Sequence, residues 1–445
     1  MSHPGQIIPR IGTPANLNTA SPREVVTRPR IPPAAPEEAG LHYACWILLS
    51  AMLSVFVSLG VGRFALGMLL PAMATNLGLG YVQMGGISSA GFVGFLLGAL
   101  WVQRLRPRHG ERRLIFRAMM VMIATMVGIS IAGSFVPLLI LYTGTGLGSG
   151  IALVCTINLT RRWFTSKWRG RANGLIFAGA GLAIILAGWA VPLINSTMGP
   201  QGWRLGWLGL AAVCLPLALF CRIIVRNRPA DLGLRPFGTK AKTKNQSWGS
   251  RAAKQAAPRA SLRFLIMRLG AIYFLFGLTY VVYATFAVTT LVREHGMGGA
   301  QTGYFWIGLG FFSLFCGPLL GALSDSLGRR VGISLALLLQ GCAYALMAYG
   351  NSDGAVYLSI ALFGLSVLGL PMIITATAAD YLTPRRAIGV IGTITVLLGL
   401  GQILGPILAA MAAAYSGSFT PAYLAATSLV ALAIAITLTL PAPSK

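Results

Sequence analysis

Twelve apolar runs, each about as long as a lipid bilayer is thick, constrain this chain more than any other feature of its sequence. A helix needs about 20 consecutive apolar residues to cross a membrane, and each run meets that length. The runs therefore predict an all-α membrane protein with twelve transmembrane helices. They lie at residues 43–73, 81–103, 113–135, 137–160, 170–195, 203–225, 264–293, 302–324, 329–350, 354–379, 386–414 and 420–441.

The composition excludes an ordinary soluble domain. Hydrophobic residues make up 56% of the 445 positions and charged residues only 10%, whereas an average soluble domain carries about 25% charged residues. The net charge of +26 would be expected of a nucleic-acid-binding protein if the basic residues formed one exposed surface on a folded domain. Because they fall in connections between apolar runs, we expect a lipid bilayer as partner and no nucleic acid.

The basic residues also predict the orientation of the chain. All but three of the 35 lysines and arginines lie in segments that twelve crossings place on one side of the membrane. The exceptions are Arg63, Arg204 and Arg293. Because connections rich in Lys and Arg stay in the cytoplasm, we expect a multi-pass protein of the cytoplasmic (inner) membrane with both termini cytoplasmic.

Two polar segments divide the chain. Residues 1–42 are rich in Pro, Thr and Arg without apolar periodicity, which predicts a disordered cytoplasmic tail. Residues 226–262 form a basic cytoplasmic linker between the sixth and seventh runs. We therefore expect an N-terminal six-helix half at residues 43–225 and a C-terminal six-helix half at residues 263–441, in a protein that acts as a monomer.

Glycines recur in the fourth run, where Gly144 to Gly150 reads GTGLGSG. The spacing is superficially that of a dinucleotide-binding turn, but no strand precedes it and an apolar helix surrounds it. Small residues at such spacings let membrane helices approach closely. We therefore predict close helix packing here. Neither a cofactor nor a metal is expected, since the six cysteines all lie in apolar runs without a C-x-x-C pair.

Short motifs in the connections resemble those of one family. Gly321 to Arg330 reads GALSDSLGRR, which resembles the G-x-x-x-D-x-x-G-R-R signature of the major facilitator superfamily. The equivalent stretch of the first half, Gly98 to Arg113, keeps GAL and G-x-R-R but lacks the aspartate. Gly60 to Met73, GVGRFALGMLLPAM, is similar to the YbfB/YjiJ-like bacterial branch, whose substrates are largely unassigned. Three further motifs are similar to the superfamily: RGRANG (169–174), RNRPADLGLRPFG (226–238) and GQILGP (401–406).

The resemblance implies the major facilitator fold, with two six-helix halves and no enzyme activity. It also implies a secondary active transporter that works by alternating access. In this superfamily the first, fourth, seventh and tenth helices line a central cavity. Substrate-binding residues are therefore expected on those four spans.

Charged residues near the span ends predict a conformational latch. Asp325 ends the eighth span while Arg329 and Arg330 begin the ninth, so the carboxylate can pair with them and hold two helices together in one state. A static loop staple is the alternative. Asp380, beside Arg385, is expected to form another such latch. The missing aspartate predicts a weaker or differently built latch in the first half.

Arg63 lies near the middle of the first span, where a charge costs about 2.5–3.5 kcal/mol. Such residues usually face a bundle interior or a water-filled cavity. None of the nine acidic residues falls in the middle of a span, so an anionic ligand could supply the missing charge. The alternative is a structural arginine, satisfied by carbonyls and water or extended outward, that fixes helix one to helix five or seven.

Other candidate substrate contacts are uncharged. Thr279, Tyr280 and Tyr283 lie in the seventh span and Asn158 in the fourth. Because no acidic residue or histidine lies in the middle of a span, a co-transported proton could travel on a weakly acidic substrate. Uniport or exchange is equally open.

Three functions fit these features. The sequence favours a secondary active transporter of a small organic solute, an organic anion above all. Efflux of a lipophilic neutral or anionic compound on the same fold is the alternative. The third, of another class, is a non-transporting membrane sensor or enzyme, but intramembrane catalysis would need an acid, a histidine or an activated nucleophile within a span, and the sequence offers none.

Overall fold

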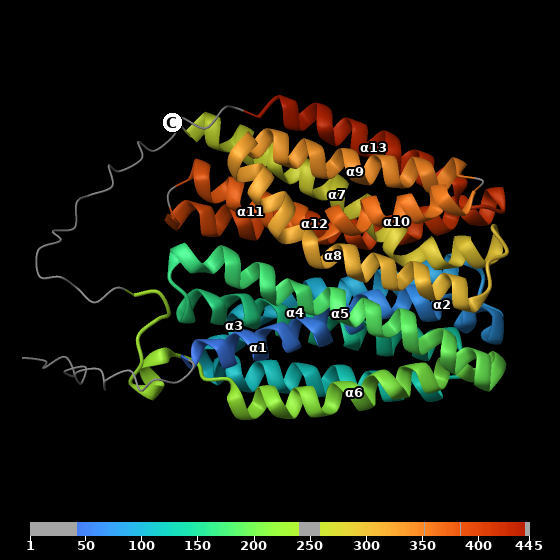
Figure 1. The fold of residues 1–445 in the computed structure, drawn as a ribbon, viewed down its shortest axis with the longest axis horizontal. Coiled ribbons are helices and arrows are strands. Elements are labelled where there is room, and N and C mark those ends of the chain that lie inside the picture. The colour runs from blue at the N-terminus through green and yellow to red at the C-terminus, as the bar shows by residue number, and fades with distance from the viewer. Residues whose placement is uncertain (1–41, 240–258, 351, 383, 441–445) are drawn as a thin grey trace, which may run out of the picture.

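The protein is an all-helical bundle (Figure 1). The computed structural model describes residues 42–239, 259–350, 352–382 and 384–440. Almost all of the predicted N-terminal tail and the centre of the predicted linker lie outside these residues. Within them the β-pairing consists of one isolated parallel bridge, between Phe164 and Phe237.

Eleven helices in the described ranges are long and apolar enough to cross a membrane. Two are composite: the first, Ala44–Leu77, joins α1 (Ala44–Val55), the π-helix η1 (Phe56–Phe64) and α2 (Ala65–Leu77), and the ninth, Asp353–Tyr381, joins α10 (Asp353–Val367) and α11 (Gly369–Tyr381). The others are α3 (Tyr81–Ile131), α4 (Phe135–Trp163), α5 (Ser166–Met198), α6 (Gly202–Ile224), α7 (Arg259–Arg293), α8 (Gly299–Leu327), α9 (Arg329–Tyr349), α12 (Pro384–Ser416) and α13 (Thr420–Leu438). Two short 3₁₀ helices, η2 (Gly199–Gln201) and η3 (Pro229–Leu232), lie in connections.

Helix α3 differs from the prediction of two spans joined by a loop. It has 51 residues, about 77 Å at 1.5 Å per residue, against a hydrocarbon core of about 30 Å. Its regular geometry breaks at Gly110, where φ is 71°, a conformation that glycine adopts without strain. The expected loop is therefore helical up to a sharp kink, and the Asn227 side chain accepts a hydrogen bond from the Arg112 N–H just beyond it (2.9 Å).

The glycines of α4 lie directly against the main chain of α3, as the sequence predicted. A Cβ atom at Gly146 would collide with the Gly91 carbonyl, and one at Gly150 with the Phe95 carbonyl. Gly94 of α3 faces the Thr143 carbonyl in the same way. The predicted close packing is confirmed, because these helices touch backbone to backbone.

Helices of the first and second parts of the chain gather in two groups, coloured blue to green and yellow to red in Figure 1. Polar side chains join the groups near the start of α3. Ser88 Oγ lies 2.9 Å from Thr285 Oγ1 of α7, and Ser89 donates to the Ile403 carbonyl of α12 at 2.7 Å. The Tyr81 ring packs edge-on against Phe419.

Candidate functional site

The local fold around Arg63 is a nine-residue π-helix, η1, inside the first membrane helix. π-Helical turns are rare and frequently mark functional sites. Gly60 and Gly62 permit this turn to pack closely, because a Cβ at either position would collide with Ala183 of α5 or Met122 of α3. Tyr142 of α4 donates to the Gly62 carbonyl at 3.1 Å. Arg63 therefore lies on a π-helical turn that packs closely against α3, α4 and α5.

The Arg63 side chain faces other helices of the bundle. Its guanidinium carbon lies 3.5 Å from the centre of the Phe95 ring and 5.3 Å from that of Phe92, both on α3. Aromatic faces attract such a cation. Its Nη1 atom donates a hydrogen bond to the Tyr280 hydroxyl of α7 at 3.4 Å. Arg63 thus joins the first membrane helix to α3 and α7.

Two nitrogens of Arg63, Nε and Nη2, are buried without a hydrogen-bond partner. These two form one edge of the guanidinium, the geometry that binds a carboxylate through two parallel hydrogen bonds. The ion pairs of the described residues join Glu111, Asp325 and Asp380 to other arginines. A buried cation without such a partner is costly, so this edge of Arg63 is left unsatisfied within the protein.

Tyr280 links Arg63 to a third helix. Its hydroxyl lies 2.6 Å from Nε2 of Gln402 on α12, and the Gln402 Oε1 atom is buried without a partner. The Tyr280 ring stacks on Phe276 with centres 4.7 Å apart. The site therefore combines aromatic faces, a cation with free donors and an amide with a free acceptor.

The other predicted substrate contacts lie apart from this cluster. The Tyr283 hydroxyl is 2.8 Å from Ser359 Oγ, and its ring stacks on Phe363 in the core of the second group of helices. Thr279 donates to the Leu275 carbonyl of its own helix (2.9 Å), and Asn158 is half-buried on α4. Of the five predicted residues, the structure brings Arg63 and Tyr280 into contact.

Three members of the cluster were not predicted from the sequence: Phe92, Phe95 and Gln402. Gln402 had a usable signal, since it is the single amide side chain of its apolar run and lies inside the GQILGP motif. The two phenylalanines had none, because α3 is apolar throughout this stretch. Among the described residues, no three His, Cys, Asp or Glu side chains are grouped closely enough to hold a metal ion.

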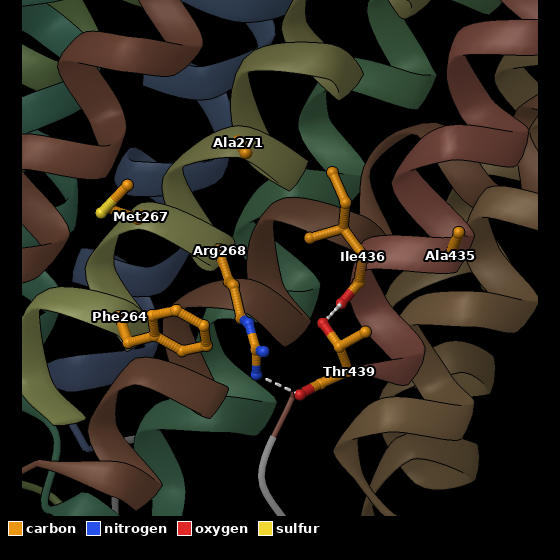
Figure 2. Close-up of a pocket in the computed structure, with 7 residues that line it drawn as sticks. All are labelled: Phe264, Met267, Arg268, Ala271, Ala435, Ile436 and Thr439. Atoms are coloured by element: carbon orange, nitrogen blue, oxygen red, sulfur yellow. Dashed lines mark hydrogen bonds between the residues drawn. The ribbon is translucent and has the colours of Figure 1, made fainter.

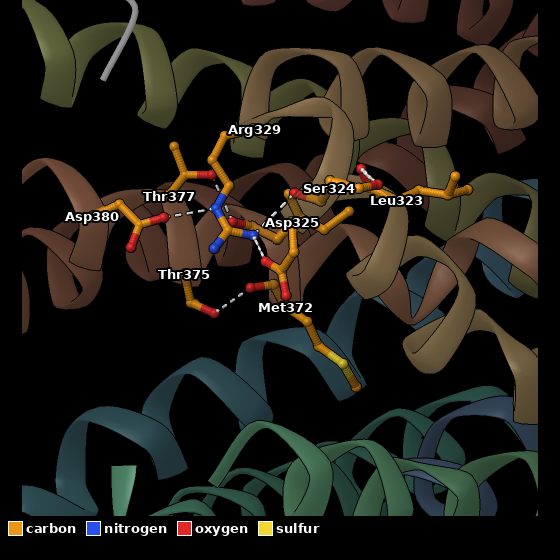
Figure 3. A network of polar contacts seen from close by, with 10 residues as sticks. Leu323, Ser324, Asp325, Arg329, Met372, Thr375, Thr377 and Asp380 are labelled. Atoms are coloured by element: carbon orange, nitrogen blue, oxygen red, sulfur yellow. Dashed lines mark hydrogen bonds and ion pairs between the residues drawn. The ribbon is translucent and has the colours of Figure 1, made fainter. Parts of the chain in front are cut away.

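The predicted latch residues meet at the ends of α8, α9 and α11. Figure 3 shows the Arg329 guanidinium between two carboxylates: Nη1 lies 2.5 Å from Asp325 and Nε 2.7 Å from Asp380. We call Asp325, Arg329 and Asp380 the second-half latch. Arg330 Nε is buried without a partner, and the side chain of Arg385 lies outside the described part of the chain.

The first half carries a different ion-pair cluster in the equivalent place. Glu111 follows the kink of α3, and its carboxylate is 3.0 Å from Arg162 Nη1 at the end of α4 and 3.5 Å from Arg106 Nε. The Glu111 side chain is 2% exposed. We call Arg106, Glu111 and Arg162 the first-half ion pairs. The sequence signal for this cluster is Glu111, the one acidic residue among the arginines of residues 104–117.

A surface hollow lies elsewhere among the described residues. It measures about 450 Å³ and is formed by the start of α7 and the end of α13. Figure 2 shows Arg268 reaching across it to the Thr439 carbonyl. Phe264 and Met267 are exposed at its rim, so it is a groove on the surface of the bundle. It does not include the Arg63 cluster.

Eleven membrane-capable helices in the described residues, packed around a buried polar cluster, define a polytopic membrane protein. The chain belongs to the major facilitator family described as "Uncharacterised MFS-type transporter YbfB", which matches residues 55–438. It is therefore a multi-pass membrane transporter and not an enzyme.

Curated relatives in sequence are transporters as well. The 3-(3-hydroxy-phenyl)propionate transporter of Escherichia coli (strain K12) is 29% identical over 370 residues, covering 82% of this chain and 86% of its own. The 4-hydroxybenzoate transporter PcaK of Pseudomonas putida is 26% identical over 397 residues, covering 84% and 86%. The gallate transporter of Pseudomonas putida is 25% identical, covering 80% and 82%.

Solved structures of transporters share the fold. A bacterial homolog of the human lysosomal transporter Spinster, in an inward-facing and unoccupied conformation, matches with a TM-score of 0.67 at 16% identity, covering 89% of this chain and 97% of its own. The nucleoside transporter NupG matches with a TM-score of 0.66 at 14% identity, covering 90% and 99%.

Proposed function

We propose that this protein carries a small aromatic carboxylate across the membrane by alternating access, and that Arg63 binds the carboxylate. The observation that carries the proposal is the pair of buried, unpartnered nitrogens on Arg63. Each free donor in a dry site costs about 1–3 kcal/mol until an acceptor arrives. A carboxylate satisfies both donors and neutralises the charge in one step.

Two further features favour an aromatic acid over an aliphatic one. Phe92 and Phe95 border the guanidinium, while Tyr280 and Phe276 form a stacked pair on the opposite helix. Flat rings gain about 0.5–1.5 kcal/mol per aromatic pair beyond the area that they bury. The substrates named for the three relatives in sequence are aromatic acids, which supports the same class here.

The chain crosses the membrane twelve times in this proposal. The kink at Gly110 divides α3 into two crossings, which together with the ten other membrane-capable helices make two halves of six. The basic connections then face the cytoplasm with both termini, in the cytoplasmic (inner) membrane.

Alternating access requires each half to move as a unit. The second-half latch fastens α8, α9 and α11 to one another, and the first-half ion pairs fasten α3 to α4. The contacts of Ser88 with Thr285 and of Ser89 with Ile403 join the two halves and must break when the transporter opens on that side. Bistable contacts of this kind separate the two states.

A proton can accompany the substrate without a protein carboxylate at the site. In the described chain the acidic side chains that form ion pairs, Glu111, Asp325 and Asp380, do so with arginines other than Arg63. A weak acid that takes up a proton from the compartment where it binds, crosses with that proton and releases it on the other side would supply the coupling itself.

Uptake into liposomes tests the proposal. Purified protein should transport 4-hydroxybenzoate or a related aromatic acid, and Arg63→Gln should reduce that uptake at least about tenfold, the loss expected from one charge-assisted hydrogen bond. Arg204→Gln is the matched control, because this arginine binds main-chain carbonyls at the end of α3. Equal uptake by the Arg63 variant and the wild type would remove Arg63 from the site.

A further inference from the structure

Gln402 occupies a position that close helix packing fixes. It lies on α12 and is 1% exposed. Its neighbours Gly401 and Gly405 press against the main chain of α7, since a Cβ at either would collide with the carbonyl of Phe274 or Leu278. This approach brings the amide within 2.6 Å of the Tyr280 hydroxyl. The amide therefore has little freedom to find another partner.

The hydrogen bonds around Tyr280 use only one end of the Gln402 amide. The Tyr280 hydroxyl is shared by Arg63 Nη1 at 3.4 Å and Gln402 Nε2 at 2.6 Å. Gln402 Oε1 remains buried without a partner, as do the two nitrogens of Arg63. Tyr280 thus contacts both Arg63, which has two free donors, and Gln402, which has one free acceptor.

We infer that Gln402 is the specificity-determining residue of this transporter, and that it binds the ring hydroxyl of a hydroxylated aromatic acid whose carboxylate lies at Arg63. This inference rests on the proposed function. A hydroxyl both donates and accepts a hydrogen bond, so it can pair with either end of the amide. An acid without the hydroxyl leaves the amide unpaired in a dry site.

The transporter should discriminate between acids with and without the ring hydroxyl, because only the former satisfy the Gln402 amide. A site built to hydrogen-bond a hydroxyl rejects the analogue that lacks it far more strongly than a hydrophobic pocket rejects a missing methylene. Tyr280 serves both ends of the site, because its oxygen accepts hydrogen bonds from Arg63 and from Gln402, so its replacement would also disturb the carboxylate side. Gln402 is therefore the side chain whose replacement should change selectivity rather than binding as a whole.

The experiment compares two matched pairs of acids on purified protein: 4-hydroxybenzoate with benzoate, and 3-(3-hydroxyphenyl)propionate with 3-phenylpropionate. The wild type should bind the hydroxylated member of at least one pair about tenfold more tightly, the factor that corresponds to one buried hydrogen bond. Gln402→Leu and Gln402→Met should abolish this preference, because they lower the affinity for the hydroxylated acid more than the affinity for the unsubstituted acid. Thermal unfolding establishes that both variants are folded.

Gln340→Leu is the matched control. Gln340 is a fully buried glutamine on α9 whose Nε2 also lacks a partner, and it contacts Tyr344 rather than the Arg63 cluster. Gln340→Leu should leave the preference for the hydroxylated acids unchanged. Retention of the preference in both Gln402 variants, or an equal loss of affinity for both acids of a pair, would overturn the inference.

The outcomes separate this inference from the proposed function. If the acids bind, and Arg63→Gln weakens their binding at least about tenfold while the Gln402 variants keep the wild-type preference, only the role of Gln402 falls. If the wild type binds none of the four acids, the proposed function falls and the role of Gln402 falls with it.

Discussion

Gly150→Ala is expected to destabilise the protein and weaken its substrate site together. A Cβ at Gly150 would lie 3.0 Å from the Ala99 nitrogen and 3.1 Å from the Phe95 carbonyl carbon, and would overlap the Phe95 carbonyl oxygen. All three atoms belong to the main chain of α3, so no flexible side chain can give way. Ordinary carbon contacts need about 3.5–4.0 Å, and therefore α3 and α4 must separate by roughly 0.5–1 Å.

The energy follows from that separation. A gap of this size forfeits about a quarter to a half of the dispersion energy of each contact, and overpacking of this kind costs about 1–3 kcal/mol. Alanine returns up to about 1 kcal/mol of helix propensity. With the largest overpacking cost, about 3 kcal/mol, and the full gain in helix propensity, about 1 kcal/mol, the unfolding free energy falls by about 2 kcal/mol. Since Phe95 carries the ring against Arg63, affinity for aromatic acids should fall as well.

Denaturant unfolding in detergent micelles measures the effect, with Gly86→Ala on α3 as the control. A Cβ at Gly86 meets the Phe135 ring no closer than 3.4 Å, so that substitution should be neutral or slightly stabilising. Equal stability of the two variants would refute the claim that α3 and α4 touch through their main chains at Gly150.

Four further substitutions test the ion pairs and the substrate site. Asp380→Asn should slow turnover more than it weakens binding, because the Asp380 carboxylate pairs with Arg329 at 2.7 Å and neither residue belongs to the substrate site. Asp325→Asn should have the same effect but a smaller one, since its carboxylate is 68% exposed. A variant whose only defect is in affinity would contradict the latch role. Glu111→Gln should likewise slow uptake in liposomes without changing equilibrium binding, and an unchanged rate would show that the first-half ion pairs are dispensable. Tyr280→Phe should lower affinity for aromatic acids by about three- to tenfold, because it removes the hydroxyl that accepts hydrogen bonds from Arg63 and Gln402 and holds both side chains in place. Unchanged affinity in a binding titration would exclude this tyrosine from the site.

The course of the membrane helices could be read from the sequence because the length of an apolar run is a local property. Most predicted boundaries lie within a few residues of the observed ones, often where a glycine changes the main-chain direction, as at Gly78 and Gly328. The helical stretch before Gly110 escaped this reasoning. Its arginines are polar enough for a loop but are also good helix formers, so the sequence alone did not decide between the two.

The site was only partly predictable, for a physical reason. Arg63 stands out because a charge in an apolar run is costly wherever it lies. Its partners depend on how α3, α7 and α12 pack together, and that register is set by backbone contacts such as those of Gly401 and Gly405 with α7. The π-helical turn at Phe56–Phe64 packs against α5 and α3 through Gly60 and Gly62, and these contacts between distant segments leave no local signal in the sequence.

The most direct test of the anion site compares 4-hydroxybenzoate with its neutral amide, 4-hydroxybenzamide, in a calorimetric binding titration of the wild type and Arg63→Gln. The two ligands share ring and hydroxyl and differ in charge. We expect the wild type to bind the acid at least about tenfold more tightly than the amide, and the variant to bind both alike. A variant that still prefers the acid by the wild-type factor would contradict the assignment of the carboxylate to Arg63.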